Sequence, residues 1–351
     1  MSPRPESLGY SVYLTSFERQ REELETLAGS GAAVFLSLHI SEEFSRDYCR
    51  RAEETCRWLK EREYRIFADV STKTVAQFGQ PDLIRLAERL GIWALRVDYG
   101  FTTEEIAALA ARIPVVVNAS TTRPEDAAHI AAAGPLVMAM HNFYPRPETG
   151  LDDEFFLEST RALQAAGLKV LAFIPGDGEL RGPIHEGLPT LERHRGLPPS
   201  ACFADLAVRI GVDGIFVGDP GTSARERTRI LRFCREGVLE IPARLAPEAE
   251  WLYGQVFTNR PDSPAWLIRF AESREYSCFG RQVTPKDCLP RTRGSITVDN
   301  DGYGRYSGEV QLIRSDLPVD GRVNVVGQVE APWLLLTDCV SRGAKFVLTR
   351  D

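Results

Sequence analysis

Two aspartates close short apolar runs in the first two-thirds of this 351-residue chain. Asp69 ends the run YRIFAD, and Asp98 ends the run WALRVD. If these runs are neighbouring strands of a parallel sheet, about 4.8 Å apart, both carboxyl groups can point into one cavity from rigid supports. Two carboxyl groups at such range can divide the roles of acid and base between them. We therefore predict that Asp69 and Asp98 are catalytic.

A second group of acids lies in the segment IPGDGELRGPIHEGLPTLERHR, residues 174–195. This Gly- and Pro-rich connection is long for a link between a strand and a helix, and loops of that length often have a function. Asp177 and Glu186 are the alternative candidates for the second catalytic carboxylate. Either one could instead be a solvated loop acid.

Polar and cationic residues after the other apolar runs predict a binding site for an anionic ligand. Arg181 and the turn GDPGTS, residues 218–223, have the donors that a phosphate needs, and barrels often bind phosphate after their last two strands. The remaining strand-end residues that we expect to contact a substrate are His39, Glu42, Tyr99, Asn118, His141, Asn142, Tyr144, Arg146, Arg195 and Asp219.

No metal and no cofactor are predicted from these side chains. His39, His141 and His194 do not form the H-x-x-x-H pair of a helical zinc site, and the seven cysteines contain no C-x-x-C pair. Strand-end histidines and aspartates from different strands remain an alternative set of metal ligands. The odd number of scattered cysteines is typical of reduced thiols, so we expect a cytoplasmic protein.

The elements that must position these side chains repeat along residues 9–238. Apolar runs alternate with amphipathic stretches rich in Glu, Arg and Ala, which predicts repeated strand–helix units and a parallel sheet. Eight such units close a (β/α)8 barrel of the TIM type. A doubly wound open sheet is the alternative, but its G-x-G-x-x-G fingerprint is missing after the first strand. The eight runs are GYSVYL, AAVFLSLHI, YRIFADVS, IWALRVDYG, IPVVVNAS, PLVMAMHNF, LKVLAFIPG and DGIFVGDPG.

Helix signals follow these runs. Residues 102–113 and 122–134 each begin with a threonine that could cap a helix, and acids in the first turn favour the helix dipole. The longest predicted helix covers residues 41–63.

The strand–helix rhythm stops after Val238. Strand-like segments such as PAWLIRF, GSITVDN, GEVQLIR and GRVNVVGQV follow, separated by Gly, Pro and Asp turns, and the chain closes with a short helix and a last strand. We predict a catalytic barrel domain over residues 1–239 and a small β-rich domain over residues 240–351.

Composition limits the partners. The formal charge of -7 repels polyanions, so we do not expect nucleic acid or an anionic membrane as a partner. We expect a small, anionic ligand instead. No apolar stretch is long enough to predict a membrane span, and the first nine residues do not resemble a secretory signal. The oligomeric state cannot be predicted from these features.

Four segments together resemble one family: FLSLHISEE, MHNFYPRPETGL, residues 174–195 quoted above, and RGSITVDNDGYGRYSGEVQL. They are similar to the MupG-type 6-phospho-N-acetylmuramidases, bacterial proteins with a TIM barrel and a C-terminal cyclophilin-like domain. The resemblance implies hydrolysis of a 6-phosphomuramyl disaccharide to MurNAc 6-phosphate and GlcNAc during cell-wall recycling. Glycoside hydrolysis needs two carboxyl groups, which suits the acids named above.

Two other functions remain open. One is a barrel lyase or aldolase, although Lys73 is the only lysine near a strand end and a Schiff base would need one there. The other is a non-enzymatic protein that binds a sugar phosphate. Two carboxyl groups that converge beside an anion-binding loop would favour hydrolysis over both.

Overall fold

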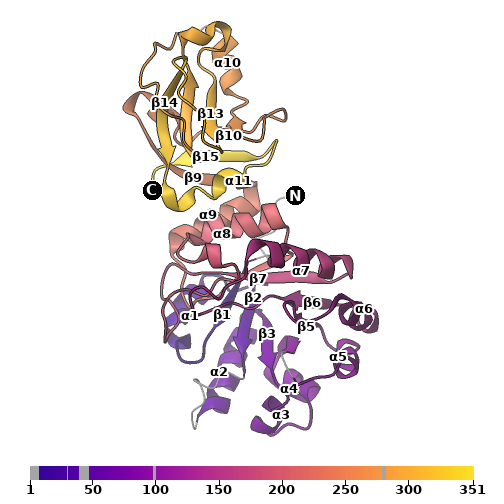
Figure 1. Ribbon diagram of the computed structural model, residues 1–351. Coiled ribbons are helices and arrows are strands. Elements are labelled where there is room, and N and C mark those ends of the chain that lie inside the picture. Colours follow the sequence, from indigo (N-terminus) through magenta and orange to yellow (C-terminus); the bar gives the residue numbers. More distant parts are fainter. Residues whose placement is uncertain (1–7, 30, 39–46, 98–99, 279–281) are drawn as a thin grey trace. The chain divides into compact units, whose positions relative to one another are not determined.

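The computed structural model describes the chain except for residues 1–7, 30, 39–46, 98–99 and 279–281. Eight parallel strands close a barrel in sequence order, which confirms the predicted TIM-type fold. Figure 1 shows these strands with helices α1 to α7 on their outer side. The strands are β1 (Leu8–Val12), β2 (Ala33–Ser37), β3 (Arg65–Val70), β4 (Ile92–Val97), β5 (Val115–Asn118), β6 (Val137–Met140), β7 (Lys169–Ile174) and β8 (Gly214–Val217).

The helices begin close to where their caps predict. Thr102 caps α5 through a capping box with Glu105, as predicted. The threonine cap predicted for α6 is wrong, because Arg123 occupies the N-cap position and Pro124 the first turn. The helices of this part are α1 (Phe17–Glu25), α2 (Tyr48–Glu61), α3 (Thr74–Gln77), α4 (Leu83–Leu90), α5 (Thr103–Ala110), α6 (Pro124–Ala133) and α7 (Asp153–Ala165).

Aromatic rings fill the barrel interior below its C-terminal end. Phe35, Phe67, Phe173 and Phe216 point inward from four strands, and neighbouring rings lie 5.3–5.8 Å apart. Gly9 makes this packing possible, because a Cβ there would lie 2.4 Å from the Phe216 ring. The interior is therefore a packed core, and polar chemistry is left to the strand ends.

A second, mixed sheet of seven strands follows, in the order β10-β15-β9-β14-β12-β13-β11. The four predicted strand segments are confirmed as β11 to β14, and the last predicted strand as β15. The elements after β7 are η3 (Glu192–His194), α8 (Pro199–Ala204), the π-helix η4 (Asp205–Ile210), α9 (Ala224–Glu236), β9 (Val238–Leu245), η5 (Pro247–Leu252), β10 (Val256–Thr258), β11 (Leu267–Arg269), α10 (Ser273–Cys278), β12 (Ser295–Asp299), η6 (Asp301–Tyr306), β13 (Val310–Ile313), β14 (Val323–Val329), η7 (Ala331–Trp333), α11 (Leu336–Cys339) and β15 (Lys345–Thr349).

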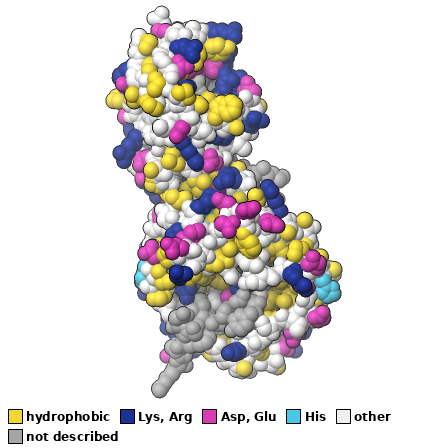
Figure 2. Space-filling model, in the orientation of Figure 1, with side chains coloured by type: hydrophobic (Ala, Val, Ile, Leu, Met, Phe, Trp, Pro, Cys, Tyr) yellow, Lys and Arg dark blue, Asp and Glu magenta, His cyan; other side chains and the backbone are white. Residues whose placement is uncertain are grey.

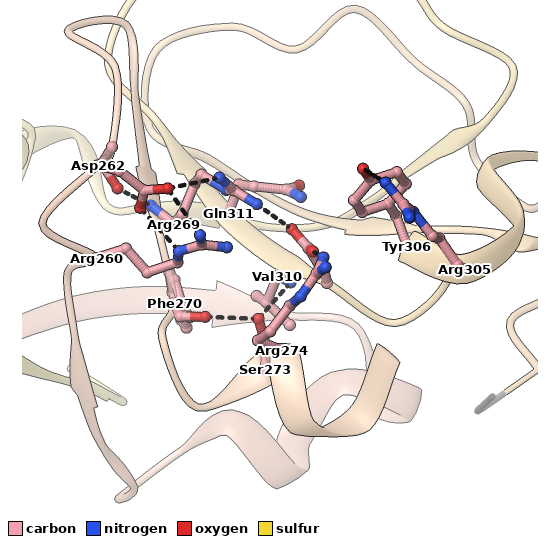
Figure 3. A network of polar contacts seen from close by, with 12 residues as sticks. Arg260, Asp262, Arg269, Phe270, Ser273, Arg274, Arg305, Tyr306, Val310 and Gln311 are labelled. Atoms are coloured by element: carbon pink, nitrogen blue, oxygen red, sulfur yellow. Dashed lines mark hydrogen bonds and ion pairs between the residues drawn. The ribbon is translucent and has the colours of Figure 1, made fainter. Parts of the chain in front are cut away.

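One side of this sheet carries a network of arginines and acids (Figure 3). Glu309 is buried and accepts hydrogen bonds from Arg269, at 2.8 Å, and from Arg274. Burial alone would raise the pKa of Glu309, but these two guanidinium groups hold it below its usual value. Asp262 accepts two hydrogen bonds from Arg260 at 2.7–2.9 Å. These arginines are therefore engaged in holding the sheet and its turns together.

The chain divides into two compact units. One contains Pro5–Pro199 with Ile210–Ala224, and the other contains Ser200–Arg209 with Arg225–Asp351. The predicted boundary between residues 239 and 240 stays a prediction. None of the described helices has the length and apolar content needed to cross a bilayer. On the face seen in Figure 2, basic and acidic side chains are intermixed.

Candidate functional site

A polar layer lies at the C-terminal ends of β2, β3 and β4. Ser37, Asp69 and Arg96 occupy paired register positions on these adjacent strands. Asp69 accepts a hydrogen bond from Arg96 Nη1 at 2.6 Å through Oδ1, and from Ser37 Oγ at 3.3 Å through Oδ2. The side chains of Asp69 and Arg96 are 8% and 5% exposed. The strand ends therefore hold a buried carboxylate beside a buried guanidinium.

Arg96 extends this layer across the barrel. Its second terminal nitrogen donates a hydrogen bond to Oδ1 of Asn142, which follows β6. Asn142 is one of the predicted substrate contacts, whereas Arg96 is not among the predicted site residues. Alternation along the strand does indicate an inward position for Arg96. Ala94 belongs to the inward-facing core, and Arg96 lies two residues further along the same strand.

Four of the predicted site residues lie outside the described part of the chain. They are His39, Glu42, Asp98 and Tyr99. The separation between the carboxyl groups of Asp69 and Asp98 therefore stays a prediction.

The loop after β7 is organised by Asp219. This aspartate is 2% exposed and accepts three backbone hydrogen bonds, from Gly176 and Leu188 at 2.9 Å and from Arg181 at 3.0 Å. Burial raises the pKa of Asp219, while the three N–H donors and the Arg181 charge act against that shift. Asp219 thus holds the two ends of the loop, and all three contacts are to protein atoms.

Arg181 is held at the start of this loop with its cationic group over a ring. Its guanidinium carbon lies 4.6 Å from the centre of the Tyr13 ring, and Tyr13 OH donates to Gly218 O at 2.5 Å. Among the described residues, no carboxylate forms an ion pair with Arg181. Because a cation–π contact leaves the N–H edges of a guanidinium available, Arg181 can still bind an oxyanion.

The turn at residues 218–223 is less available than its sequence predicted. Gly218 N donates to Ile174 O at 2.9 Å, Gly221 N to Glu179 O at 3.1 Å, and Ser223 N to Asp177 Oδ1 at 2.8 Å. Thr222 N donates to Glu23 Oε2 at 3.3 Å. Pro220 has no N–H. These four N–H groups are therefore engaged within the protein, which leaves the turn poorly suited to cradle a phosphate.

The two loop acids that were alternative catalytic candidates differ in their contacts. Both Asp177 and Glu186 are exposed. Asp177 caps Ser223 N, whereas the part of Glu186 that makes a described contact is its backbone oxygen, which accepts from Arg195 Nη1 at 3.1 Å. Neither of these two acids is placed in a buried pocket.

The ion pair of Arg195 and Glu192 connects the loop after β6 with the loop after β7. Arg195 donates to both oxygens of Glu192 at 2.7 Å and to the backbone oxygens of Gly187 and Tyr144 at 2.9 Å. Glu192 also accepts from the backbone N–H of Glu148, at 2.8 Å. The Arg195 hydrogen bond is the main reason that the pKa of Glu192 falls to about 2. Arg195 is predicted to bind substrate, but its N–H groups form hydrogen bonds with protein atoms, and it therefore positions the loops.

His141 faces away from the barrel interior. It is fully buried, with Nε2 3.0 Å from Thr160 Oγ1 on α7 and its ring 4.5 Å from the Phe156 ring. Burial lowers the pKa of His141 to about 3, so the ring is neutral near pH 7. The structure therefore does not bring His141 to the predicted site.

The remaining predicted ligands are placed at or near the strand ends. Asn118 closes β5 and is 7% exposed, with its side-chain oxygen 3.0 Å from Ser120 N. Tyr144 is half-buried and Arg146 is exposed. Within the described ranges, no cluster of three or more His, Cys, Asp or Glu side chains could hold a metal ion.

The fold is a TIM barrel with polar side chains at the C-terminal ends of its strands, where enzymes of this fold have their active sites. Two family models match the chain: the N-terminal domain of 6-phospho-N-acetylmuramidase over residues 8–232, and the C-terminal domain over residues 240–349. The chain belongs to the 6-phospho-N-acetylmuramidase family, and it is a glycosidase-like hydrolase.

Two solved structures are similar over nearly the whole chain. A conserved Enterococcus faecalis protein of unknown function is 31% identical, with a TM-score of 0.83, over 98% of this chain and 96% of that one. An uncharacterized B. cereus protein is 23% identical, with a TM-score of 0.78, over 100% of both chains, and it supports the fold alone. The comparison with curated proteins found no match.

Proposed function

We propose that this protein hydrolyses the glycosidic bond of a 6-phosphorylated N-acetylmuramyl disaccharide, releasing MurNAc 6-phosphate and GlcNAc. The observation that carries this proposal is the buried Asp69 carboxylate at the end of β3, in a chain that both domain models of this hydrolase family match. The physiological setting that we propose is cell-wall recycling in a bacterial cytoplasm.

The reaction needs two carboxyl groups in different states. One protonates the oxygen of the departing GlcNAc as the bond to the anomeric carbon breaks, and the other attacks that carbon or removes a proton from the attacking water. Asp69, paired with Arg96, is suited to the negatively charged role. Asp98 follows β4 directly in the sequence and is our candidate for the acid, with Glu186 as the alternative.

We assign the substrate phosphate to Arg181. Its guanidinium forms no ion pair with a carboxylate among the described residues, and it lies in the loop after β7. The turn at 218–223 takes no part in this proposal, because its N–H groups are bound within the protein.

The test is a comparison of two substrates. The purified protein is incubated with the 6-phosphorylated disaccharide and with the same disaccharide lacking the phosphate, and the products are followed by mass spectrometry. We expect MurNAc 6-phosphate and GlcNAc from the first, and much slower cleavage of the second. Equal turnover of both would contradict the phosphate assignment, and binding without cleavage would favour the non-enzymatic alternative.

A further inference from the structure

The second unit contains a cavity of about 420 Å³, and its described lining residues include none of the predicted site residues. Its floor is made by Val298 of β12 and by Val325 and Val326 of β14. Its walls are η5, which contributes Glu248 and Trp251, and the segment 282–287. This volume lies in the range of pockets that bind small molecules.

The wall at 282–287 is fixed to the floor by hydrogen bonds. Asn324 of β14 accepts from Lys286 N at 3.0 Å and donates to Thr284 O at 2.9 Å. Asp287 O accepts from Val325 N at 3.1 Å, and Asp287 has a left-handed φ of 47°. A non-glycine residue held in that conformation is costly, so the surrounding contacts determine it. The cavity is therefore largely formed before any ligand binds.

The lining combines an apolar surface with a polar rim. The valines and the half-buried Trp251 indole line the cavity with apolar surface, while the exposed Gln282 and Thr284 add neutral polar groups. An indole beside apolar side chains suits the C–H face of a pyranose ring, and amides suit its hydroxyl groups.

Charge at the rim selects against an anion. The described lining residues include two acids, Glu248 and Asp287, and one base, Lys286, which gives them a formal charge of -1. Lys286 is already paired with Glu248 and lies 3.9 Å from Asp287. The hydrogen bond to Glu248 raises the pKa of Lys286, so the ammonium group stays charged and remains paired with Glu248. A phosphorylated sugar would meet net negative charge here, whereas a neutral sugar would not.

We propose that this cavity binds a neutral N-acetylated amino sugar, with the sugar ring against Trp251 and its acetyl methyl group on the valine floor. The choice of an amino sugar rests on the proposed function, in which GlcNAc is the neutral half of the substrate. The cavity is then a sugar site lined by described residues of the second unit alone.

The experiment uses the full-length protein labelled with 5-fluorotryptophan, because the chain has five tryptophans and each gives its own ¹⁹F signal. The signals are assigned by single Trp→Phe variants. GlcNAc and GlcNAc 6-phosphate are then titrated separately. We expect GlcNAc to shift the Trp251 signal with saturation, and the phosphorylated sugar to bind at least about tenfold more weakly at this signal. Trp266, which is 55% exposed in the same unit and does not line the cavity, is the internal control and should not shift.

The outcomes separate this inference from the proposed function. An unmoved Trp251 signal, or equal shifts with both sugars, overturns the inference even if the protein cleaves the disaccharide. A saturable, GlcNAc-selective shift that persists in Asp69→Asn supports it even if no cleavage is found. As a second measurement, Trp251→Ala should lower GlcNAc binding measured by saturation-transfer NMR at least about fivefold, and Trp266→Ala should leave it unchanged. Equal binding by the two variants would also overturn the inference.

Discussion

Asp69 in the barrel unit and Asp299 in the second unit are buried aspartates at strand ends, and the two have different surroundings. Asp69, at the end of β3, contacts the buried guanidinium of Arg96 at 2.6 Å. Asp299, at the end of β12, is hydrogen-bonded to Gln311 instead, and burial raises its pKa to about 7. The nearby Glu309 carboxylate adds to that rise, while Gln311 and the charges of Arg269 and Arg291 oppose it. In the second unit, burial thus raises the pKa of an aspartate whose hydrogen-bond partner is an amide, whereas the buried aspartate of the barrel is paired with a guanidinium.

The largest effect on stability is expected from breaking the pair in the barrel. Arg96→Gln removes the cation that is paired with the buried Asp69 carboxylate, which should lower the free energy of unfolding by about 3–5 kcal/mol. Urea denaturation measures this. The same substitution made in Asp69→Asn should cost clearly less, because no buried carboxylate is then left behind. Equal costs in both backgrounds would mean that the pair is not coupled.

Asp299 should make the second unit less stable as the pH rises. The ordinary pKa of an aspartate is 3.8, and burial raises the pKa of Asp299 to about 7 in the folded protein. Between pH 4 and pH 7 the carboxyl group is therefore charged in the unfolded chain and still mostly neutral in the folded one. The stabilising effect of the neutral carboxyl group is complete below pH 4 and is lost as the pH rises through 7. Asp299→Asn should therefore have a higher free energy of unfolding than the wild type at pH 8, by at most about 4 kcal/mol, and nearly the same value at pH 4. Urea denaturation at the two pH values measures this difference. A pH-independent difference would contradict this account.

Arg181 should affect substrate binding more than the chemical step. If Arg181 contacts the phosphate equally in the ground and transition states, Arg181→Ala raises KM about tenfold and leaves kcat nearly unchanged, a loss of about 1.4 kcal/mol. Arg146→Ala is the comparison, since Arg146 is an exposed cation that is also predicted to contact substrate, and we expect it to raise KM less than Arg181→Ala does. A fall in kcat without a change in KM would show that Arg181 acts in the chemical step.

The smallest effect is expected at Asp177. This exposed carboxylate accepts the Ser223 N–H, and an amide oxygen can accept the same hydrogen bond. Asp177→Asn should keep kcat/KM within about threefold of the wild type. A hundredfold loss would move the second catalytic carboxylate from β4 to the loop after β7.

The sequence predicted the eight barrel strands because each is a short apolar run followed by an amphipathic stretch, a local pattern that the barrel preserves. It placed Asp69 at a strand end for the same reason. It did not identify Arg96, since Arg96 lies inside the run WALRVD and is followed by Asp98, the last polar residue of that run. Applying the two-residue alternation of strands would have found Arg96, and would have assigned His141 to the outer face of β6.

Other features could not be predicted from local sequence. The turn at 218–223 has the composition of a phosphate loop, yet its N–H groups are bound by Asp177 and by Glu23, which is 199 residues away from Thr222 in the sequence. Arg195 is likewise engaged by Tyr144 and Gly187 from two different loops. Which donors remain available depends on such distant contacts, and composition does not show them.

The most direct test of the account is the turnover of the 6-phosphorylated disaccharide by Asp69→Asn. The amide keeps the size of the side chain and removes the charge, so kcat should fall by about a hundredfold or more while circular dichroism shows a folded protein. Ser37→Ala, which removes only the long hydrogen bond to Asp69, is the matched control and should retain most of the activity. Near-normal turnover by a folded Asp69→Asn protein would contradict the assignment of Asp69 as a catalytic carboxylate.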